Sequence, residues 1–229
     1  MHLYIDKKIK IYFYIFLFLL LSTITNNKIL KTSNIYTIKK IEINNLEIKL
    51  KKKIEKSLHD LFDQNIFTIN KKEINDKLNK INFIDTVSIK KKFPSTLIVD
   101  VNIADLLVKT NINNQIFLIG SNGKLIDIGL VTLKKDLPIF FGNFEKDKFF
   151  NFLFYLGKTN LKLIDFKSVY LFPSGRWDIE TKKQIKIKLP LNNLESSLNL
   201  VEKIIEKHGD KKKYTIDLRI KNQVILSDE

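Results

Sequence analysis

Two alternating apolar runs, separated by a proline-containing corner, impose the strongest constraint on the fold. "IDTVSI" (Ile84 to Ile89) and "TLIVDV" (Thr96 to Val101) alternate apolar and polar residues around Phe93-Pro94-Ser95. Alternation at period two is typical of half-buried strands, and proline favours a turn because it fixes φ and removes a ladder donor. The sequence therefore predicts a hairpin, whose lysines 90–92 face water and discourage unwanted edge pairing.

The residues before this hairpin predict a strand and two helices. "IKKIEI" (Ile38 to Ile43) alternates as a strand does, and a helix follows in which lysines fill the faces left by a narrow apolar stripe. Asn70, with Glu73 three residues later, is the reciprocal capping arrangement that begins a second helix. The predicted order is strand, helix, helix, strand, strand. The apolar stripes of the two helices are Ile54, Leu58, Leu61 and Ile74, Leu78, Ile81.

The second half of the chain predicts a further domain rich in strands. Strands are expected on both sides of the Ser121-Asn122-Gly123 turn, in "DLPIFFGN" (136–143), and in three runs across residues 167–190. Asn192 or Asn193 is expected to cap a helix that ends at Gly209, and two strands close the chain. The fold class is therefore α+β, with mainly antiparallel strands and flanking helices.

An apolar segment near the N-terminus predicts a membrane anchor. "IYFYIFLFLLL" (Ile11 to Leu21) follows a basic start and, counted from Ile9 to Thr25, just reaches the lower end of the length that spans a bilayer. A cleaved signal peptide is the alternative, but no A-x-A pattern follows Leu21. Lysines flank both ends of the segment, so charge does not decide orientation. A cytoplasmic N-terminus is allowed because long C-terminal domains translocate largely regardless of charge.

Composition excludes some chemistry and weakens a nucleic-acid role. The 229 residues carry a formal net charge of +15, which would suit phosphate, but Arg176 and Arg219 are the only arginines among 40 basic residues. The lysines are spread along the chain from Lys7 to Lys221. We therefore expect no dedicated nucleic-acid surface. Cysteine is absent, which excludes disulfides, thiolate metal ligands and a cysteine nucleophile.

No arrangement of residues in the sequence predicts catalysis. The three histidines are far apart, and no HExxH motif is present. "GKT" at residues 157–159 resembles the end of a P-loop, but Phe152 stands where that loop has its first glycine. "GSNG" at 120–123 reads as a hairpin turn between alternating strands. We expect a non-enzymatic protein without a metal, a cofactor or a small-molecule substrate.

These elements together resemble the FtsQ/DivIB family of bacterial cell-division proteins. The resemblance rests on the anchor, on "NIFTIN" between the predicted helices, on the hairpin, and on the succession "RWDI", "IKLP", helix, "IDLR". Two departures are Asn45, where the family usually has glycine, and residues 102–105, which replace its "E-R-x-P". The resemblance implies a cytoplasmic tail (1–10), a transmembrane helix (11–25), a linker (26–36), a POTRA domain (37–104) and a C-terminal β domain (105–229).

The last strand is the predicted site of partner binding. "NQVILSDE" (Asn222 to Glu229) is apolar in the middle and free of proline, so its open edge can accept a partner's strand or can simply meet water. The family resemblance implies that FtsB and FtsL dock here, with Arg219 suited to an acidic residue. Trp177 is expected to be a core anchor instead. The predicted partner-binding residues are Arg176, Arg219, Ile220, Val224, Ile225, Leu226 and Ser227.

The resemblance implies a scaffold at the division septum. Such a protein lies in the inner membrane as a single-pass protein with periplasmic domains, and links early and late division proteins. Two alternatives stay open at this point. One is a POTRA-bearing component of outer-membrane protein transport, which would normally continue into a barrel of many strands. The other is a membrane-tethered nucleic-acid binder, which would show steep salt dependence.

Overall fold

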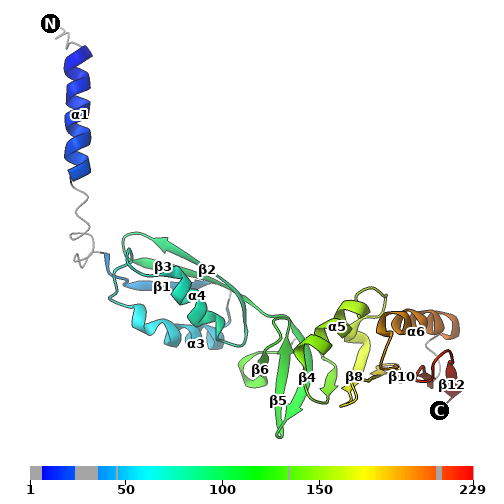
Figure 1. Cartoon of the computed structure of the whole chain (residues 1–229). Coiled ribbons are helices and arrows are strands. Elements are labelled where there is room, and N and C mark those ends of the chain that lie inside the picture. Colours follow the sequence, from blue (N-terminus) through cyan, green and yellow to red (C-terminus); the bar gives the residue numbers. More distant parts are fainter. Residues whose placement is uncertain (1–6, 24–35, 45, 134, 210–212, 229) are drawn as a thin grey trace. The chain divides into compact units, whose positions relative to one another are not determined.

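The computed structural model of the chain describes residues 7–23, 36–44, 46–133, 135–209 and 213–228 (Figure 1). Within it the chain divides into two compact units. The first unit comprises residues 1–78 and 87–101, and the second comprises residues 79–86 and 102–229. The chain is thus a mixed α+β protein in which a small sheet with two helices and a large sheet each form their own core.

The N-terminal helix, α1 (Lys7–Thr23), covers most of the predicted anchor. Its apolar side chains from Ile9 to Leu21 are exposed. Among the described residues, no helix combines the length and the apolar character needed to cross a membrane. Residues 24–25 of the predicted span, residues 26–35 of the predicted linker, tail residues 1–6 and the family departure at Asn45 lie outside the described residues.

The first unit has the predicted order of strand, helix, helix, strand, strand. Its three-stranded sheet has the order β1-β3-β2, and β1 runs parallel to β3. The helices bury four predicted stripe residues, Ile54, Leu58, Ile74 and Leu78, together with Leu50, which was not predicted. Leu61 is buried in the 3-10 turn that follows α3, whereas Ile81 lies beyond the end of α4 and is only half-buried, so its place in the predicted stripe is wrong. The elements are β1 (Lys40–Asn44), α3 (Ile48–Leu58), η2 (His59–Leu61), α4 (Lys71–Asn79), β2 (Ile84–Lys92) and β3 (Thr96–Ile103).

The hairpin between β2 and β3 departs from the prediction at one lysine. Lys90 pairs with Asp100 at 3.1 Å near the surface. Lys91 is half-buried, and its Nζ donates a hydrogen bond to the Ile69 carbonyl oxygen at 3.1 Å. Burial of this ammonium lowers the pKa of Lys91. The prediction of three solvated lysines is therefore wrong for Lys91, because the segment before α4 packs over its side chain.

The second unit contains one nine-stranded sheet with the order β12-β11-β10-β9-β8-β7-β4-β5-β6. Most neighbouring pairs are antiparallel, but β4-β7, β7-β8 and β10-β11 are parallel. Parallel neighbours need a crossover, which α5 provides between β7 and β8 and α6 provides between β10 and β11. The strands are β4 (Leu106–Ile112), β5 (Gln115–Gly120), β6 (Leu125–Asp127), β7 (Ile139–Phe141), β8 (Phe166–Leu171), β9 (Trp177–Thr181), β10 (Lys186–Lys188), β11 (Tyr214–Asp217) and β12 (Ile225–Asp228).

Helices α5 (Lys146–Leu156) and α6 (Leu194–His208) cover one face of this sheet (Figure 1). Short 3-10 turns lie at η3 (Ile128–Leu130) and η4 (Leu163–Asp165). The core between helices and sheet contains Trp177, whose ring stacks on Phe152 with centroids 4.6 Å apart. Trp177 is thus a core residue, as expected. Strand β4 and helix α5 were not predicted. In α5, exposed phenylalanines such as Phe154 obscure the helical stripe.

The start of α6 differs from the predicted cap. Asn193 precedes the helix with a positive φ of 62°, and its side chain makes no capping hydrogen bond. The hydroxyls of Ser196 and Ser197 instead donate to the Asn193 carbonyl oxygen at 3.0 and 2.9 Å. The prediction that an asparagine side chain caps α6 is therefore wrong. The predicted stop is confirmed, since Gly209 has a φ of 73° and its N–H donates to the Ile205 carbonyl.

Candidate partner-binding surface

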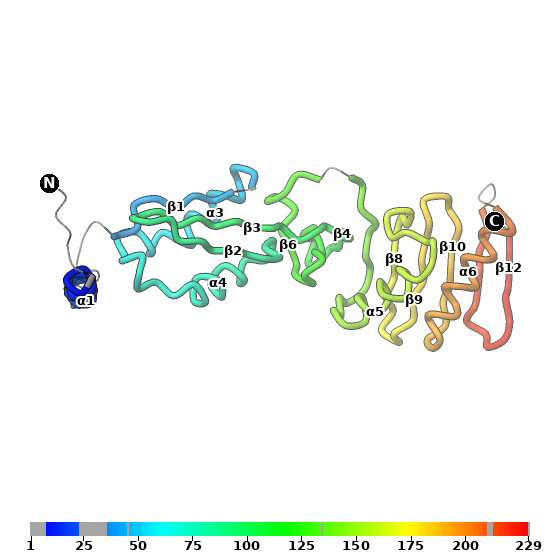
Figure 2. The backbone as a smooth tube through the Cα atoms, turned by 90° about the horizontal axis from the view of Figure 1, so that it is seen from above, coloured from blue at the N-terminus to red at the C-terminus, as the bar shows by residue number. Residues whose placement is uncertain are grey.

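Strand β12 lies at one edge of the nine-stranded sheet. It pairs with β11 in antiparallel register, with Ser227 opposite Thr215 and Ile225 opposite Asp217. Figure 2 shows the red β12 at the end of the row of strands, beyond β10. Along the described part of the chain no further strand pairs with it. One edge of β12 is therefore open, as the sequence predicted for an edge strand.

The hydrogen bonds of β11 determine which main-chain groups of β12 reach the open edge. The N–H of Leu218 donates to the Lys188 carbonyl of β10 at 2.9 Å. Main-chain groups alternate sides along a strand, so those of Asp217 point away from β10 and toward β12. Ile225 and Ser227 therefore direct their N–H and C=O groups to β11. The main-chain groups of Leu226 and Asp228 face the open edge.

The side chains of β12 project from both faces of the sheet. Leu226 lies opposite Ile216, which is fully buried in the core beneath α6. Ile225 lies opposite Asp217, on the face that α5 and α6 leave uncovered. Directly opposite residues of an antiparallel pair share a face, so the two apolar side chains flank the strand on opposite sides. Ile225 is 44% exposed and Leu226 is 42% exposed, which leaves apolar surface on both sides of the open edge.

A hollow of about 1010 Å³ lies beside this edge, between α6 and the segment 218–224. Ile220 and Val224 line it from the loop before β12, and Leu200 lines it from α6. All three side chains are exposed, as is Leu191 at the entrance of α6. Leu200 and Leu191 were not among the predicted site residues. The signal in the sequence was that Leu200 is an apolar residue outside the buried stripe of α6.

Arg219 is already engaged within the chain. Its Nε donates to Asp217 Oδ1 at 2.8 Å, and its Nη2 donates to Asp217 Oδ2 at 2.5 Å. These hydrogen bonds lower the pKa of Asp217 and raise the pKa of Arg219. The guanidinium still has exposed surface, so a partner carboxylate would share it with Asp217. An ion pair between Arg219 and an acidic residue of a partner stays a prediction.

The Asp217–Arg219 pair predicts a small, pH-dependent contribution to stability. Because the folded state lowers the pKa of Asp217 below its ordinary value of 3.8, the contribution is present above that value and is lost as pH falls through the lowered pKa. We expect Asp217→Asn to destabilise the chain by about 1 kcal/mol or less at neutral pH. Thermal unfolding at a series of pH values should show the difference between variant and parent shrinking below the ordinary carboxyl pKa. A difference that persisted into strong acid would contradict this account.

Arg176 precedes β9 and lies on the helix-free face, beside Asp178. Its Nε is 3.2 Å from Asp178 Oδ1, and its Cζ lies 4.3 Å from the centre of the Phe172 ring. The register places Asp178 beside Lys188, and Lys188 beside Asp217. This row continues to Ile225 on β12. The seven predicted residues therefore do not form one cluster. Arg176, Ile225 and Ser227 belong to the helix-free face, and Leu226 lies on the opposite face, on the side of α6. Ile220 and Val224 line the hollow, and Arg219 borders both the hollow and the helix-free face.

The residues around β12 have no arrangement typical of a metal centre. In the described ranges, no group of three His, Cys, Asp or Glu side chains could hold a metal ion. The groups gathered around β12 are main-chain amides, aliphatic side chains and guanidinium–carboxylate pairs. These groups recognise an extended polypeptide through hydrogen bonds, apolar contact and charge.

Two sequence families match most of the chain. Residues 36–102 match the POTRA domain of FtsQ type, and residues 107–219 match the C-terminal domain of the cell-division proteins FtsQ and DivIB. The cell division protein FtsQ of Rickettsia bellii is 27% identical over 165 residues, which cover 70% of this chain and 61% of that protein. FtsQ of Rickettsia felis is 25% identical over 170 residues, with the same shares. The chain thus spans less than two thirds of the length of these relatives.

One solved structure is also similar. It is the major extracytoplasmic domain of the trans isomer of the bacterial cell division protein DivIB from Geobacillus stearothermophilus. It covers 45% of this chain and 92% of its own, with 14% sequence identity and a TM-score of 0.34.

Proposed function

The chain belongs to the FtsQ/DivIB family of bacterial cell-division proteins, and on that premise we propose that it is a non-enzymatic scaffold of the division machinery. In this role it links early and late division proteins at the septum and recruits FtsB- and FtsL-like proteins through β12. The observation that carries the proposal is the open edge of β12, flanked by exposed apolar side chains. The match of residues 107–219 to the division family leaves the outer-membrane transport alternative without support.

Binding at β12 would proceed by strand addition. A partner strand would pair with the main-chain groups of Leu226 and Asp228, each hydrogen bond contributing about 1 kcal/mol. Apolar side chains of the partner would enter the hollow lined by Ile220 and Val224. An acidic residue of the partner would meet Arg219 or Arg176. Capture of FtsB- and FtsL-like proteins by the full chain tests this role.

We further propose that α1, with the residues that follow it to residue 25, anchors the chain in the inner membrane. The tail 1–10 would then be cytoplasmic, and the POTRA domain 37–104 and the β domain 105–229 would be periplasmic. The support is the run of exposed apolar side chains from Ile11 to Leu21 within α1 and the family to which the chain belongs.

A reporter fused after Glu229 tests this topology. Alkaline phosphatase is expected to be active in the fusion, because it folds productively only outside the cytoplasm, and green fluorescent protein exported in the same position is expected to be dark. The matched control lacks residues 11–25 and should give the reverse pattern. If the full chain gave a fluorescent green fluorescent protein fusion and an inactive phosphatase fusion, the proposed orientation would be refuted.

A further inference from the structure

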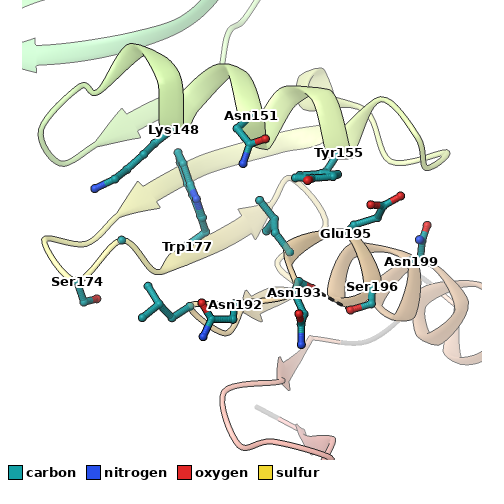
Figure 3. Close-up of a pocket in the computed structure, with 13 residues that line it drawn as sticks. Lys148, Asn151, Tyr155, Ser174, Trp177, Asn192, Asn193, Glu195, Ser196 and Asn199 are labelled. Carbon is teal, nitrogen blue, oxygen red and sulfur yellow. Dashed lines mark hydrogen bonds between the residues drawn. The ribbon is translucent and has the colours of Figure 1, made fainter.

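A second hollow, of about 770 Å³, opens on the helix side of the sheet (Figure 3). It lies between α5, the turn that contains Ser174, and the start of α6. Figure 3 shows Asn151 and Tyr155 above it on α5, Asn192 and Asn193 below it, and Asn199 on α6. We call it the amide hollow, after these four asparagines. It shares Leu191, Asn192, Asn193 and Ser196 with the hollow beside β12, whereas Asn151, Tyr155, Trp177 and Asn199 line the amide hollow and not the other one.

The four asparagine side chains of the amide hollow are available to a ligand. Across the described part of the chain, the carboxamides of Asn151, Asn192, Asn193 and Asn199 make no hydrogen bond. Each carboxamide offers two donors and one acceptor oxygen. Four such groups line one hollow at separate places, so the hollow offers hydrogen-bond donors and acceptors at several points.

Trp177 adds a buried donor to the same hollow. The residue is only 4% exposed, and its indole N–H has no hydrogen-bond partner among the described residues. Among those residues no side-chain nitrogen or oxygen is both sealed from solvent and unpartnered, so the indole N–H has access to solvent. Trp177 lines the amide hollow, and a buried indole usually finds a partner for its N–H. A polar ligand group is a fitting partner for it.

Apart from Gly175 and the uncharged hydroxyls of Ser174 and Ser196, the remaining lining is apolar or electrically balanced. Tyr155 and Leu191 contribute apolar surface. Lys148 pairs with Glu145 at 2.9 Å, and Glu195 pairs with Lys158 at 2.9 Å. Both charged residues of the lining therefore have partners of opposite charge within the chain. The hollow consequently favours a neutral ligand over a phosphate or an acidic peptide.

We propose that the amide hollow binds an uncharged oligosaccharide that carries N-acetyl groups. The acetamido and hydroxyl groups of such a sugar match separate carboxamides, while its apolar C–H faces match Tyr155 and Leu191. An extended peptide fits less well, because β9, which carries Trp177, is paired on both sides and has no open edge for strand addition. Recognition here must therefore come from side chains.

The single tryptophan of the chain makes the proposal directly measurable. Trp177 is the only tryptophan and lies in the proposed site, so its emission should report binding. Titration of the full chain with N,N′,N″-triacetylchitotriose is expected to give a saturable change in emission. Asn151→Ala and Asn199→Ala should each weaken binding about fivefold, the effect of losing one hydrogen bond of about 1 kcal/mol. Asn111→Ala, at an exposed site on β4 outside the hollow, should leave binding unchanged.

Saturation-transfer NMR on the sugar provides a second readout. Transfer to the acetyl methyl protons is expected with the parent chain and should decrease in Asn151→Ala. Three outcomes would overturn the proposal: no saturable response to the sugar, equal affinity for maltotriose, which lacks acetamido groups, or undiminished binding in both asparagine variants. An FtsB- or FtsL-like protein that displaced the sugar would be compatible with the proposal only if the sugar binds to the chain in the absence of that protein.

Discussion

Leu226→Pro is expected to weaken capture of FtsB- and FtsL-like proteins at least about tenfold. Proline removes the N–H that Leu226 presents to the open edge, which is worth about 1 kcal/mol, and its ring obstructs an incoming strand. The pairing with β11 should survive, because that pairing uses the main-chain groups of Ile225 and Ser227. The measurement is a pull-down or a binding titration with the purified full chain and its partners.

Two further variants separate the main chain from the side chain. Leu226→Ala keeps the N–H and should lose only the apolar contact, so its capture should exceed that of Leu226→Pro. Ile225→Pro should disturb the pairing with β11 and is therefore the less specific test. Unchanged capture by a folded Leu226→Pro chain would exclude strand addition at β12. Circular dichroism spectra and melting temperatures identify which variants are folded.

Phe152→Ala is expected to lower the free energy of unfolding by about 3–5 kcal/mol, which is the usual cost of removing a buried phenylalanine side chain. Phe152 is fully buried and stacks on Trp177 with its ring centroid 4.6 Å away. Its loss leaves a cavity between α5 and the sheet. Denaturant unfolding followed through the fluorescence of Trp177 measures the change, since no other tryptophan contributes.

Phe154→Ala is the matched control on the same helix. Phe154 is 60% exposed, so its truncation should change the free energy of unfolding by no more than about 0.5 kcal/mol. If the two variants were equally stable, the packing of α5 described above would be wrong. If both variants were strongly destabilised, the exposed face of α5 would contribute to folding although its side chains contact solvent.

The sequence predicted the elements whose patterns are simple. The hairpin of β2 and β3 alternates apolar and polar residues, and the stripe of α6 recurs at helical spacing, so period alone identifies both. Helix α5 is different, because phenylalanine occurs on its buried and exposed faces alike. The parallel pairings of β7 with β8 and β10 with β11 also could not be predicted, since they depend on crossovers and not on local pattern.

The candidate site was predictable in its location but not in its contacts. The terminal apolar run identified β12 as an edge strand, and the structure confirms it. The "DLR" sequence did contain the signal for the Asp217–Arg219 pair, because residues two apart on a strand share a face. The amide hollow was not predicted, because its asparagines come from α5, α6 and the segment between β10 and α6, which only the tertiary fold brings together.

The shortness of β12 sets a limit on how long a partner can remain bound. Leu226 and Asp228 together offer at most four main-chain hydrogen bonds at the open edge, or about 4 kcal/mol, which corresponds to a dissociation constant of about 1 mM. With an association rate of about 10⁶ M⁻¹s⁻¹, the residence time would be about one millisecond. Burial of one large apolar side chain in the hollow adds about 1.5–3 kcal/mol and lengthens this time roughly ten- to hundredfold. Strand addition alone would thus give a complex in rapid exchange, and its lifetime would be governed by the side chain that fills the hollow.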